Sequence, residues 1–291
     1  MVRRSAFLFP GQGRLPDSLP PTSPEIERLL DLAETRGLEL RTWLAEKEAA
    51  RLLGTDVAQP FILIDSLARE RSLRAGGVNP VLVAGHSLGE YAALVSAGVL
   101  SAHDALDVVI ERGRLMAGIA GSMAAIVKLD LDTVARLCSQ IGSDVVVANH
   151  NGTHQVVISG AEASVDRVIE LAQAAGGRGI RLEVSGPFHS PFMERAREVL
   201  AAVLDRVSFR PPSVPVVCGV SGRVETDPER LRALMKEQMT ACVRWVDVLS
   251  SLVREGVSHA VEAGSGTVLS GLGRRFTDEI QFVSYEEATD G

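Results

Sequence analysis

The chain contains a serine whose neighbours suit nucleophilic chemistry. Ser87 is the centre of Gly85-His86-Ser87-Leu88-Gly89, which matches the pattern G-x-S-x-G. This pattern is typical of a nucleophile elbow, a tight turn between a strand and a helix that exposes the serine hydroxyl. Free N–H groups and the helix dipole at such a turn favour developing negative charge. We therefore expect Ser87 to be a nucleophile and the Leu88 N–H to be one donor of an oxyanion hole.

The flanking sequence supports this interpretation. Residues 81–84 form a short β-branched apolar run that predicts a buried strand, and an apolar helix is expected to begin at Tyr91. The five-residue pattern alone is weak, since chance produces it often in a glycine-rich chain. A strand before the serine and a helix after it are the context that an elbow requires. We prefer an elbow to an ordinary strand–helix turn.

A serine nucleophile needs a general base, and two sets of residues compete for that role. In the chain order of an α/β-hydrolase, the triad would be Ser87, Asp247 and His259. Against it, His259 is expected to begin a strand and Asp247 to lie within a helix. The other set is a dyad of Ser87 and His189, which lies on a loop between two prolines. A backbone carbonyl could hold its imidazole tautomer.

Composition and charge restrict the classes of function. A hydrophobic content of 46% with 23% charged residues is that of a globular protein with a sizeable core. The net charge of −7 argues against nucleic-acid binding, which needs a basic stripe. Cys138, Cys218 and Cys242 have no C-x-x-C spacing, so neither a metal site nor a disulfide framework is indicated. No apolar run or leader suggests membrane insertion or export, and we expect a cytoplasmic protein.

A compact alternation of elements between residues 122 and 185 indicates a small second unit. Strands are expected over 123–129, 145–148, 155–159 and 179–184, and helices over 131–141 and 163–175. The order β-α-β-β-α-β is that of ferredoxin-like folds. We interpret 122–185 as a subdomain inserted into a larger α/β core made of 1–121 and 186–291. The cleft between the two units is the expected substrate site.

The α/β core is expected to hold a parallel sheet covered by helices. Strands are predicted at 6–9, 81–84, 214–220 and 259–262, the last of these being the final strand, and helices at 44–53, 60–71, 102–120, 193–204, 228–239 and 245–255, with others beginning at Pro24 and near Thr267. Arg112 and Arg114 lie on the amphipathic helix 102–120. Arginines on such a helix usually face solvent, and that is the default for both.

Five motifs occur in the order of one enzyme family. They are Phe9-Pro10-Gly11-Gln12-Gly13, Gly85-His86-Ser87-Leu88-Gly89-Glu90, Arg112-Gly113 before Met116, Gly186-Pro187-Phe188-His189-Ser190 and Gly264-Ser265-Gly266. Together they resemble the malonyl-CoA:acyl-carrier-protein transacylases and the acyltransferase domains of polyketide synthases. The resemblance covers nearly the whole chain. It implies an α/β-hydrolase-like core that carries a ferredoxin-like subdomain.

The resemblance implies ping-pong acyl transfer. Ser87 takes the malonyl group from malonyl-CoA, CoA leaves, and the phosphopantetheine thiol of an acyl carrier protein takes the acyl group, for fatty acid or polyketide synthesis. His189 is the implied base, and transfer should then weaken below the pKa of His189, which is about 6.5 unless its surroundings shift it. The N–H groups of Gln12 and Leu88 form the implied oxyanion hole. No metal or other cofactor is implied, and enzymes of this kind are often monomers.

The same resemblance assigns residues to the substrate. Arg112 pairs with the free carboxylate of the malonyl group, which reverses the default for that residue, while Arg114 stays on the surface. His86, Met116 and Phe188 are expected to bind substrate. The Phe188 ring resembles the malonyl-selecting form of its motif, because it would crowd a 2-methyl branch.

Departures from the family and other functions leave alternatives open. Arg14-Leu15 follow Gly13 where the family commonly has Ser-Gln, and Ala117 stands where it often has glutamine, so the choice of acyl group is less certain. Acyl hydrolases that clear carrier proteins share the fold but tend to lose the arginine that is present here. A malonyl transferase subunit of a malonate decarboxylase system is a further alternative. A non-catalytic scaffold should have lost Ser87 or His189, and both are present.

Overall fold

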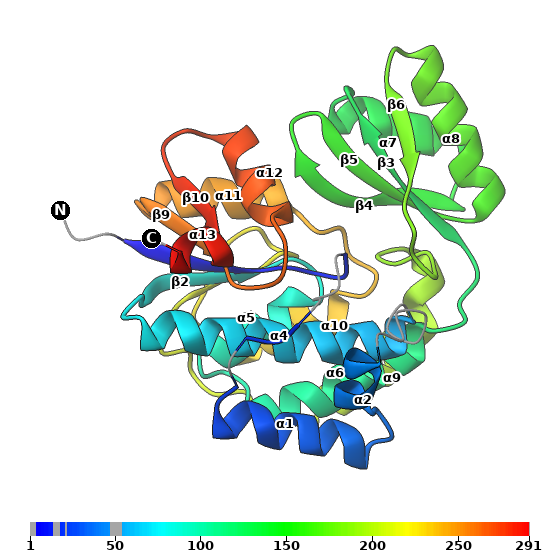
Figure 1. Ribbon diagram of the computed structural model, residues 1–291. Helices are drawn as coiled ribbons and strands as arrows, with labels where there is room; N and C mark the ends of the chain where they lie inside the picture. Colours follow the sequence, from blue (N-terminus) through cyan, green and yellow to red (C-terminus); the bar gives the residue numbers. More distant parts are fainter. Residues whose placement is uncertain (1–3, 14–17, 21, 47–53, 291) are drawn as a thin grey trace.

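The computed structural model describes residues 4–13, 18–20, 22–46 and 54–290. These residues form two separate sheets (Figure 1). The larger sheet has six strands in the order β10-β9-β1-β2-β7-β8, and the smaller has four in the order β4-β5-β3-β6. Figure 1 shows the smaller sheet and its helices at the upper right, above the larger unit.

The larger sheet is parallel except at one edge. Its strands are β1 (Ser5–Phe9), β2 (Pro80–Gly85), β7 (Val216–Val217), β8 (Val224–Glu225), β9 (His259–Glu262) and β10 (Gln281–Ser284). Only β8 pairs antiparallel, with β7. Every residue of β1 is buried, because helices cover both faces of the sheet. This explains an apolar run that does not alternate with polar residues.

Alternate residues of β1 pack into different apolar layers. Phe7 and Phe9 belong to the larger core, whereas Ala6 and Leu8 belong to a second core on the opposite face. The larger core is covered by α1 (Pro24–Thr35), α2 (Leu40–Ala45), α4 (Thr55–Ala75), α5 (Gly89–Ser96), α6 (Ala102–Met116), α9 (Glu194–Leu204) and α10 (Pro228–Glu237), and the second core by α11 (Trp245–Arg254) and α12 (Val268–Phe276). The short helix η1 (Pro191–Met193) precedes α9, and α13 (Tyr285–Thr289) follows β10.

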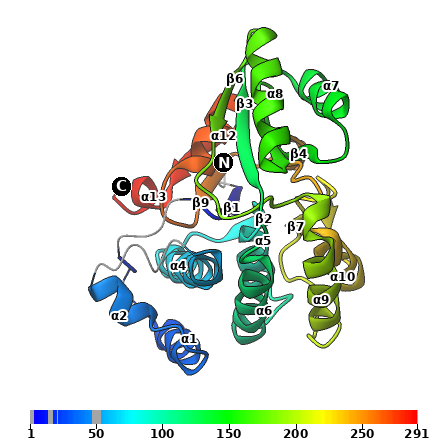
Figure 2. The same ribbon diagram turned by 90° about the vertical axis from the view of Figure 1, so that its right-hand side faces the viewer.

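The smaller sheet is antiparallel and has helices on one face (Figure 2). It comprises β3 (Ser122–Val127), α7 (Leu131–Ile141), β4 (Val145–Gly152), β5 (Gln155–Gly160), α8 (Glu162–Ala174) and β6 (Arg178–Arg181). Ala124 and Ile126 face the helices, whereas Met123 and Ala125 join the larger core. The fold class predicted from the sequence, an α/β core with a βαββαβ unit, is confirmed.

Several predicted elements have different bounds. The strand predicted as the last one, β9, is not the last, because β10 follows it in the sequence and pairs with it in parallel. Helix α4 begins at Thr55 rather than at Pro60, so Pro60 lies inside the helix, in its second turn, where one backbone hydrogen bond is lost. Helix α6 ends at Met116, and the strand predicted over 214–220 is reduced to β7. Most of the helix predicted over 44–53 lies outside the described residues.

No helix in the described part of the chain is both long and apolar enough to span a bilayer. Among those same residues, no three His, Cys, Asp or Glu side chains gather as metal ligands.

Candidate active site

Ser87 lies on a strained turn between β2 and α5. Its backbone φ of 52° is in the left-handed region, as a nucleophile elbow requires. Glycines flank it because other backbone comes very close: a Cβ on Gly85 would lie 2.1 Å from the Gly89 carbonyl carbon, and one on Gly89 would lie 2.0 Å from the Phe9 oxygen. The His86 N–H also donates to that Phe9 oxygen at 2.9 Å. The end of β1 is therefore held directly against the elbow.

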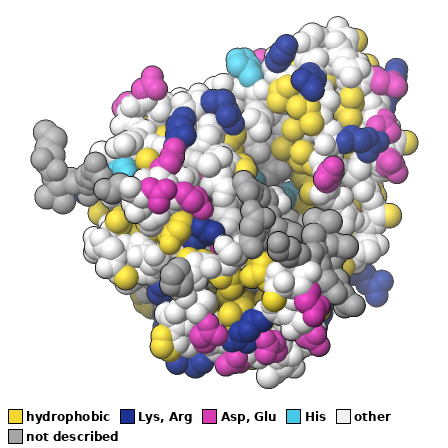
Figure 3. All heavy atoms as spheres, viewed as in Figure 1, with side chains coloured by type: hydrophobic (Ala, Val, Ile, Leu, Met, Phe, Trp, Pro, Cys, Tyr) yellow, Lys and Arg dark blue, Asp and Glu magenta, His cyan; other side chains and the backbone are white. Residues whose placement is uncertain are grey.

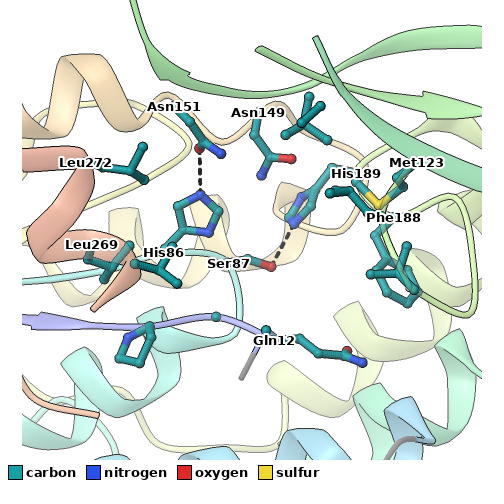
Figure 4. Close-up of a pocket in the computed structure, with 18 of the residues that line it drawn as sticks. Gln12, His86, Ser87, Met123, Asn149, Asn151, Phe188, His189, Leu269 and Leu272 are labelled. Atoms are coloured by element: carbon teal, nitrogen blue, oxygen red, sulfur yellow. Dashed lines mark hydrogen bonds between the residues drawn. The ribbon is translucent and has the colours of Figure 1, made fainter. Parts of the chain in front are cut away.

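His189 contacts the serine hydroxyl. Its Nε2 lies 2.7 Å from the Ser87 Oγ (Figure 4). On the other side of the ring, Nδ1 lies 2.9 Å from the Gln238 carbonyl oxygen and 3.0 Å from that of Ala241. Carbonyls only accept hydrogen bonds, so Nδ1 carries the proton and Nε2 presents a lone pair to the Ser87 O–H. This is the orientation that a general base needs.

The competing triad does not assemble. His259 is the first residue of β9 and pairs with Ser5, whereas Ser87 follows the last residue of β2, which pairs with Phe9. In a parallel sheet these positions are at opposite ends of the strands. Asp247 is half-buried on α11 and forms an ion pair with Arg244 at 2.7 Å. The set of Ser87, Asp247 and His259 is therefore excluded by geometry.

Arg112 is buried beside the serine, contrary to the default for an amphipathic helix. Its side chain donates from Nη1 to the Gln59 Oε1 at 2.5 Å and from Nη2 to the Gln238 Oε1 at 3.2 Å and the Ser87 Oγ at 3.3 Å. Among the described residues, no carboxylate lies within ion-pair distance of this guanidinium, and its Nε has no hydrogen-bond partner. Burial lowers the pKa of Arg112. Arg114, two residues along α6, is exposed as expected.

Gln238 and Glu90 complete the polar surroundings of Ser87, and neither residue was expected from the sequence to have a role. The Gln238 Nε2 donates to the Ser87 carbonyl oxygen at 2.8 Å and to the Glu90 Oε2 at 2.6 Å. The other Glu90 oxygen accepts from the Gly219 N–H at 2.7 Å. Glu90 belongs to the elbow motif, so its position offered a signal. Gln238 follows α10 without any motif, and no local pattern could have found it.

A cavity of about 240 Å³ opens above Ser87 between the two sheets. Its walls include Gln12, His86, Phe188 and His189 from the larger unit, and Met123, Ala125, Asn149, Asn151 and Val157 from the smaller one (Figure 4). Figure 3 shows the surface hollowed beside the smaller unit.

Three residues assigned to the site by sequence are not among those lining this cavity. Leu88 and Met116 are almost fully buried, and Arg112 lies beneath the serine. The Met116 sulfur accepts a hydrogen bond from the Gln59 Nε2 at 3.4 Å, so it packs against the arginine's neighbours rather than the open pocket. Leu88 follows Ser87 in the sequence, and Gln12 lines the same cavity as Ser87. The N–H groups of both residues are expected to form the oxyanion hole.

The pKa of His189 is shifted from the ordinary histidine value. Burial, together with the positive charge of Arg112 and the nearby His86, lowers the pKa of His189 to about 3. Burial also lowers the pKa of His86, whose Nε2 is bonded to the Asn151 Oδ1 at 2.8 Å. A rate that falls near pH 6.5 is therefore no longer expected, because His189 stays neutral well below that pH.

Known proteins that are similar to this chain in sequence or in structure belong to one family. The acyl transferase domain family matches residues 26–278. A malonyl CoA-acyl carrier protein transacylase of Bacillus subtilis is 38% identical over 98% of this chain and 94% of its own length. A crystal structure of FabD from Acinetobacter baumannii superposes with a TM-score of 0.91 at 34% identity, covering 99% of this chain and 97% of that one. A malonyl-transacylase in complex with its type II PKS acyl-carrier protein has a TM-score of 0.90 at 33% identity, with 97% and 95% covered.

Proposed function

The chain belongs to the acyl transferase family of malonyl CoA-acyl carrier protein transacylases, and from this membership we propose that Ser87 carries a malonyl group from malonyl-CoA to the thiol of an acyl carrier protein. The protein is an acyltransferase. The groups around Ser87 supply a nucleophile, a base and a cation, so we propose that the reaction needs no further cofactor.

The state of Arg112 is the observation that carries this proposal. A guanidinium that is 1% exposed, hydrogen-bonds to neutral amide and hydroxyl oxygens and has no carboxylate in direct contact among the described residues is costly to bury, although the nearby Glu90 charge offsets part of that cost. A malonyl thioester bound to Ser87 would bring a free carboxylate into reach of this arginine. The pairing would be charge-assisted and specific for an acyl group that ends in an anion. An uncharged acetyl group could not replace it.

The neutral His189 begins the chemistry. Its Nε2 takes the Ser87 proton as the serine oxygen attacks the thioester carbonyl, and the carbonyl oxygen becomes an oxyanion facing the N–H groups of Gln12 and Leu88. When the tetrahedral intermediate collapses, the C–S bond breaks and the CoA sulfur takes the proton from His189. The carrier thiol then gives its proton to His189 and its sulfur attacks the carbonyl carbon of the acyl-serine. When this second intermediate collapses, the C–O bond to Ser87 breaks and His189 returns the proton to the Ser87 oxygen, which restores the hydroxyl.

The same proposal covers the role of the smaller unit and the compartment in which the enzyme works. Residues 122–185 act as a subdomain that forms one wall of the substrate cleft, since Met123, Ala125 and Val157 line it. The enzyme works in the cytoplasm. Its three free cysteines are compatible with a reducing compartment.

Intact-mass measurement after mixing with malonyl-CoA, methylmalonyl-CoA or acetyl-CoA tests the proposal. We expect one malonyl adduct, its absence in Ser87→Ala, and a loss of roughly tenfold or more in malonyl loading for Arg112→Ala, because a charged buried hydrogen bond contributes about 1.5–3 kcal/mol. Arg114→Ala is the matched control on the same helix. An acetyl adduct that forms as fast as the malonyl adduct in the wild type, or rapid loss of the adduct to water, would instead indicate another acyl donor or a hydrolase.

The same measurement separates the two candidate bases. His189→Ala should slow adduct formation by at least about a hundredfold, because a positioned base contributes roughly 10²–10⁴ in rate. His259→Ala should retain the wild-type rate per folded molecule, since that residue lies at the other end of the sheet. The reverse result would reject the dyad.

A further inference from the structure

A buried hydrogen-bond chain joins Arg112 to the loop that follows β1. The Arg112 Nη1 donates to the Gln59 Oε1 at 2.5 Å, and the Gln59 Nε2 donates to the Thr55 Oγ1 at 2.8 Å. The Thr55 hydroxyl in turn donates to the Gln12 Oε1 at 2.8 Å. Thr55 is 1% exposed and Gln59 is fully buried, so water does not reach the bonds among Arg112, Gln59 and Thr55, whereas Gln12 is half-buried at the wall of the cavity.

The donors and acceptors in this series of hydrogen bonds can be arranged in only one direction, from Arg112 to Gln12. A guanidinium has no acceptor, so the oxygen of the Gln59 amide must face Arg112. The amide nitrogen then points at Thr55 and can only donate. Because the Thr55 oxygen accepts that bond, its own proton is turned toward an acceptor, which is the Gln12 side-chain oxygen. Each group therefore fixes the orientation of the next.

Thr55 is also held at a fixed position relative to Arg112 through the backbone. Gly113, the residue after Arg112, packs against the first turn of α4. A Cβ on Gly113 would lie 2.8 Å from the Asp56 Cα and 2.9 Å from the backbone carbonyl oxygen of Thr55. Helices α4 and α6 thus touch at the level of the arginine. Motion of Thr55 against Arg112 is restricted by this contact.

We propose that Thr55 is a positioning residue that couples recognition of the acyl carboxylate at Arg112 to the orientation of the Gln12 loop beside Ser87. The inference rests on the proposed function. Thr55 touches no substrate; it keeps the Gln59 oxygen turned toward Arg112 and anchors the Gln12 side chain. A malonyl substrate depends on both effects, whereas an acetyl substrate depends only on the second.

Thr55→Val removes the hydroxyl at nearly constant volume and is the main test. We expect kcat/KM for malonyl loading to fall roughly tenfold, because the Gln59 N–H and the Gln12 oxygen lose buried partners. Acetyl loading should fall less, so the malonyl-to-acetyl preference decreases. Thr55→Ser keeps a hydroxyl and should restore the preference. In an Arg112→Ala background, Thr55→Val should no longer change the preference, since the pair acts as one unit.

Ser66→Ala is the matched control. Ser66 is buried on the same helix, and its hydroxyl has no hydrogen-bond partner among the described residues. It should leave both substrates unaffected. Equal losses of malonyl and acetyl loading in Thr55→Val would leave the preference unchanged. That result would overturn the proposal and leave Thr55 a structural residue. If the wild type forms no malonyl adduct at all, it is the proposed function that fails instead.

Discussion

At the scale of single residues, the substrate's charge and the base are linked through Arg112. The positive guanidinium and burial together lower the pKa of His189 to about 3, so the free enzyme holds a neutral imidazole. Accepting the Ser87 proton makes an imidazolium beside that guanidinium. A malonyl carboxylate paired with Arg112 would reduce this repulsion. The proper substrate is therefore expected to make proton transfer easier, which an acetyl group cannot do.

The pH dependence follows from this pKa. In the proposed mechanism the base is the neutral form of His189, which predominates at every pH above its pKa of about 3. Malonyl adduct formation should therefore be nearly constant between about pH 8 and pH 5, instead of falling near the ordinary histidine pKa of about 6.5. Rapid-quench mass spectrometry with circular dichroism at each pH checks this. A midpoint near 6.5 in folded protein would contradict the low pKa.

At the scale of elements, the site depends on the close approach of α5 to the end of β1. The first residue of α5 is Gly89, and the oxygens of Phe9 and Pro10 lie where its Cβ would be, at 2.0 and 2.7 Å. This contact brings the Gln12 loop beside the elbow. The glycine spacing of the motif is thus a packing requirement between a strand end and a helix start.

Gly89→Ala should therefore destabilise the protein. The added methyl group meets backbone atoms that cannot move independently, and we expect the free energy of unfolding to fall by at least ~2 kcal/mol. Urea denaturation measures this as a lower midpoint. Gly271→Ala on α12 is the control, because its Cβ would meet only the flexible end of Arg275 at 3.6 Å. Equal midpoints for the two variants would mean that the backbone at the end of β1 shifts at little cost to make room for the methyl group.

At the scale of the whole molecule, the edge strand β4 of the smaller sheet is attached beside the cavity to the segment between α10 and α11. The Val243 N–H donates to the Ala148 oxygen at 2.8 Å, and the His150 N–H donates to the Val243 oxygen at 2.9 Å, which joins β4 to the larger unit through backbone. Next to this bridge, His86 beside the nucleophile bonds to Asn151 of β4. The smaller unit is thus attached directly at the active site.

Asn151→Ala should loosen this attachment. It leaves a half-buried His86 nitrogen without its partner, so we expect the free energy of unfolding to fall by about 1 kcal/mol. Limited proteolysis should then cut more readily between the two units. Thr153→Ala, exposed at the turn of the same hairpin, should change stability by less than about 0.5 kcal/mol. An Asn151 variant as stable as this control would show that the contact contributes little.

The sequence alone was enough for features that local patterns determine. The elbow at Ser87 is specified by two glycines and the strand and helix beside it, all within a dozen residues. The βαββαβ order of residues 122–185 follows from hydrophobic periodicity, which acts over one element at a time. Short or edge elements such as β8 and β10 were missed, since few residues carry their signal.

Tertiary structure decided everything that depends on residues meeting across the chain. Ser87 and His189 are 102 positions apart, and Arg112 and Gln238 are 126 apart. From the residues alone His189 and His259 were both candidates, and only the ends of the parallel strands separate them. Thr55 and Gln238 carry no motif, because their positions matter through hydrogen bonds to residues from other parts of the chain. A side chain's type sets which bonds it can form, but packing sets its partner.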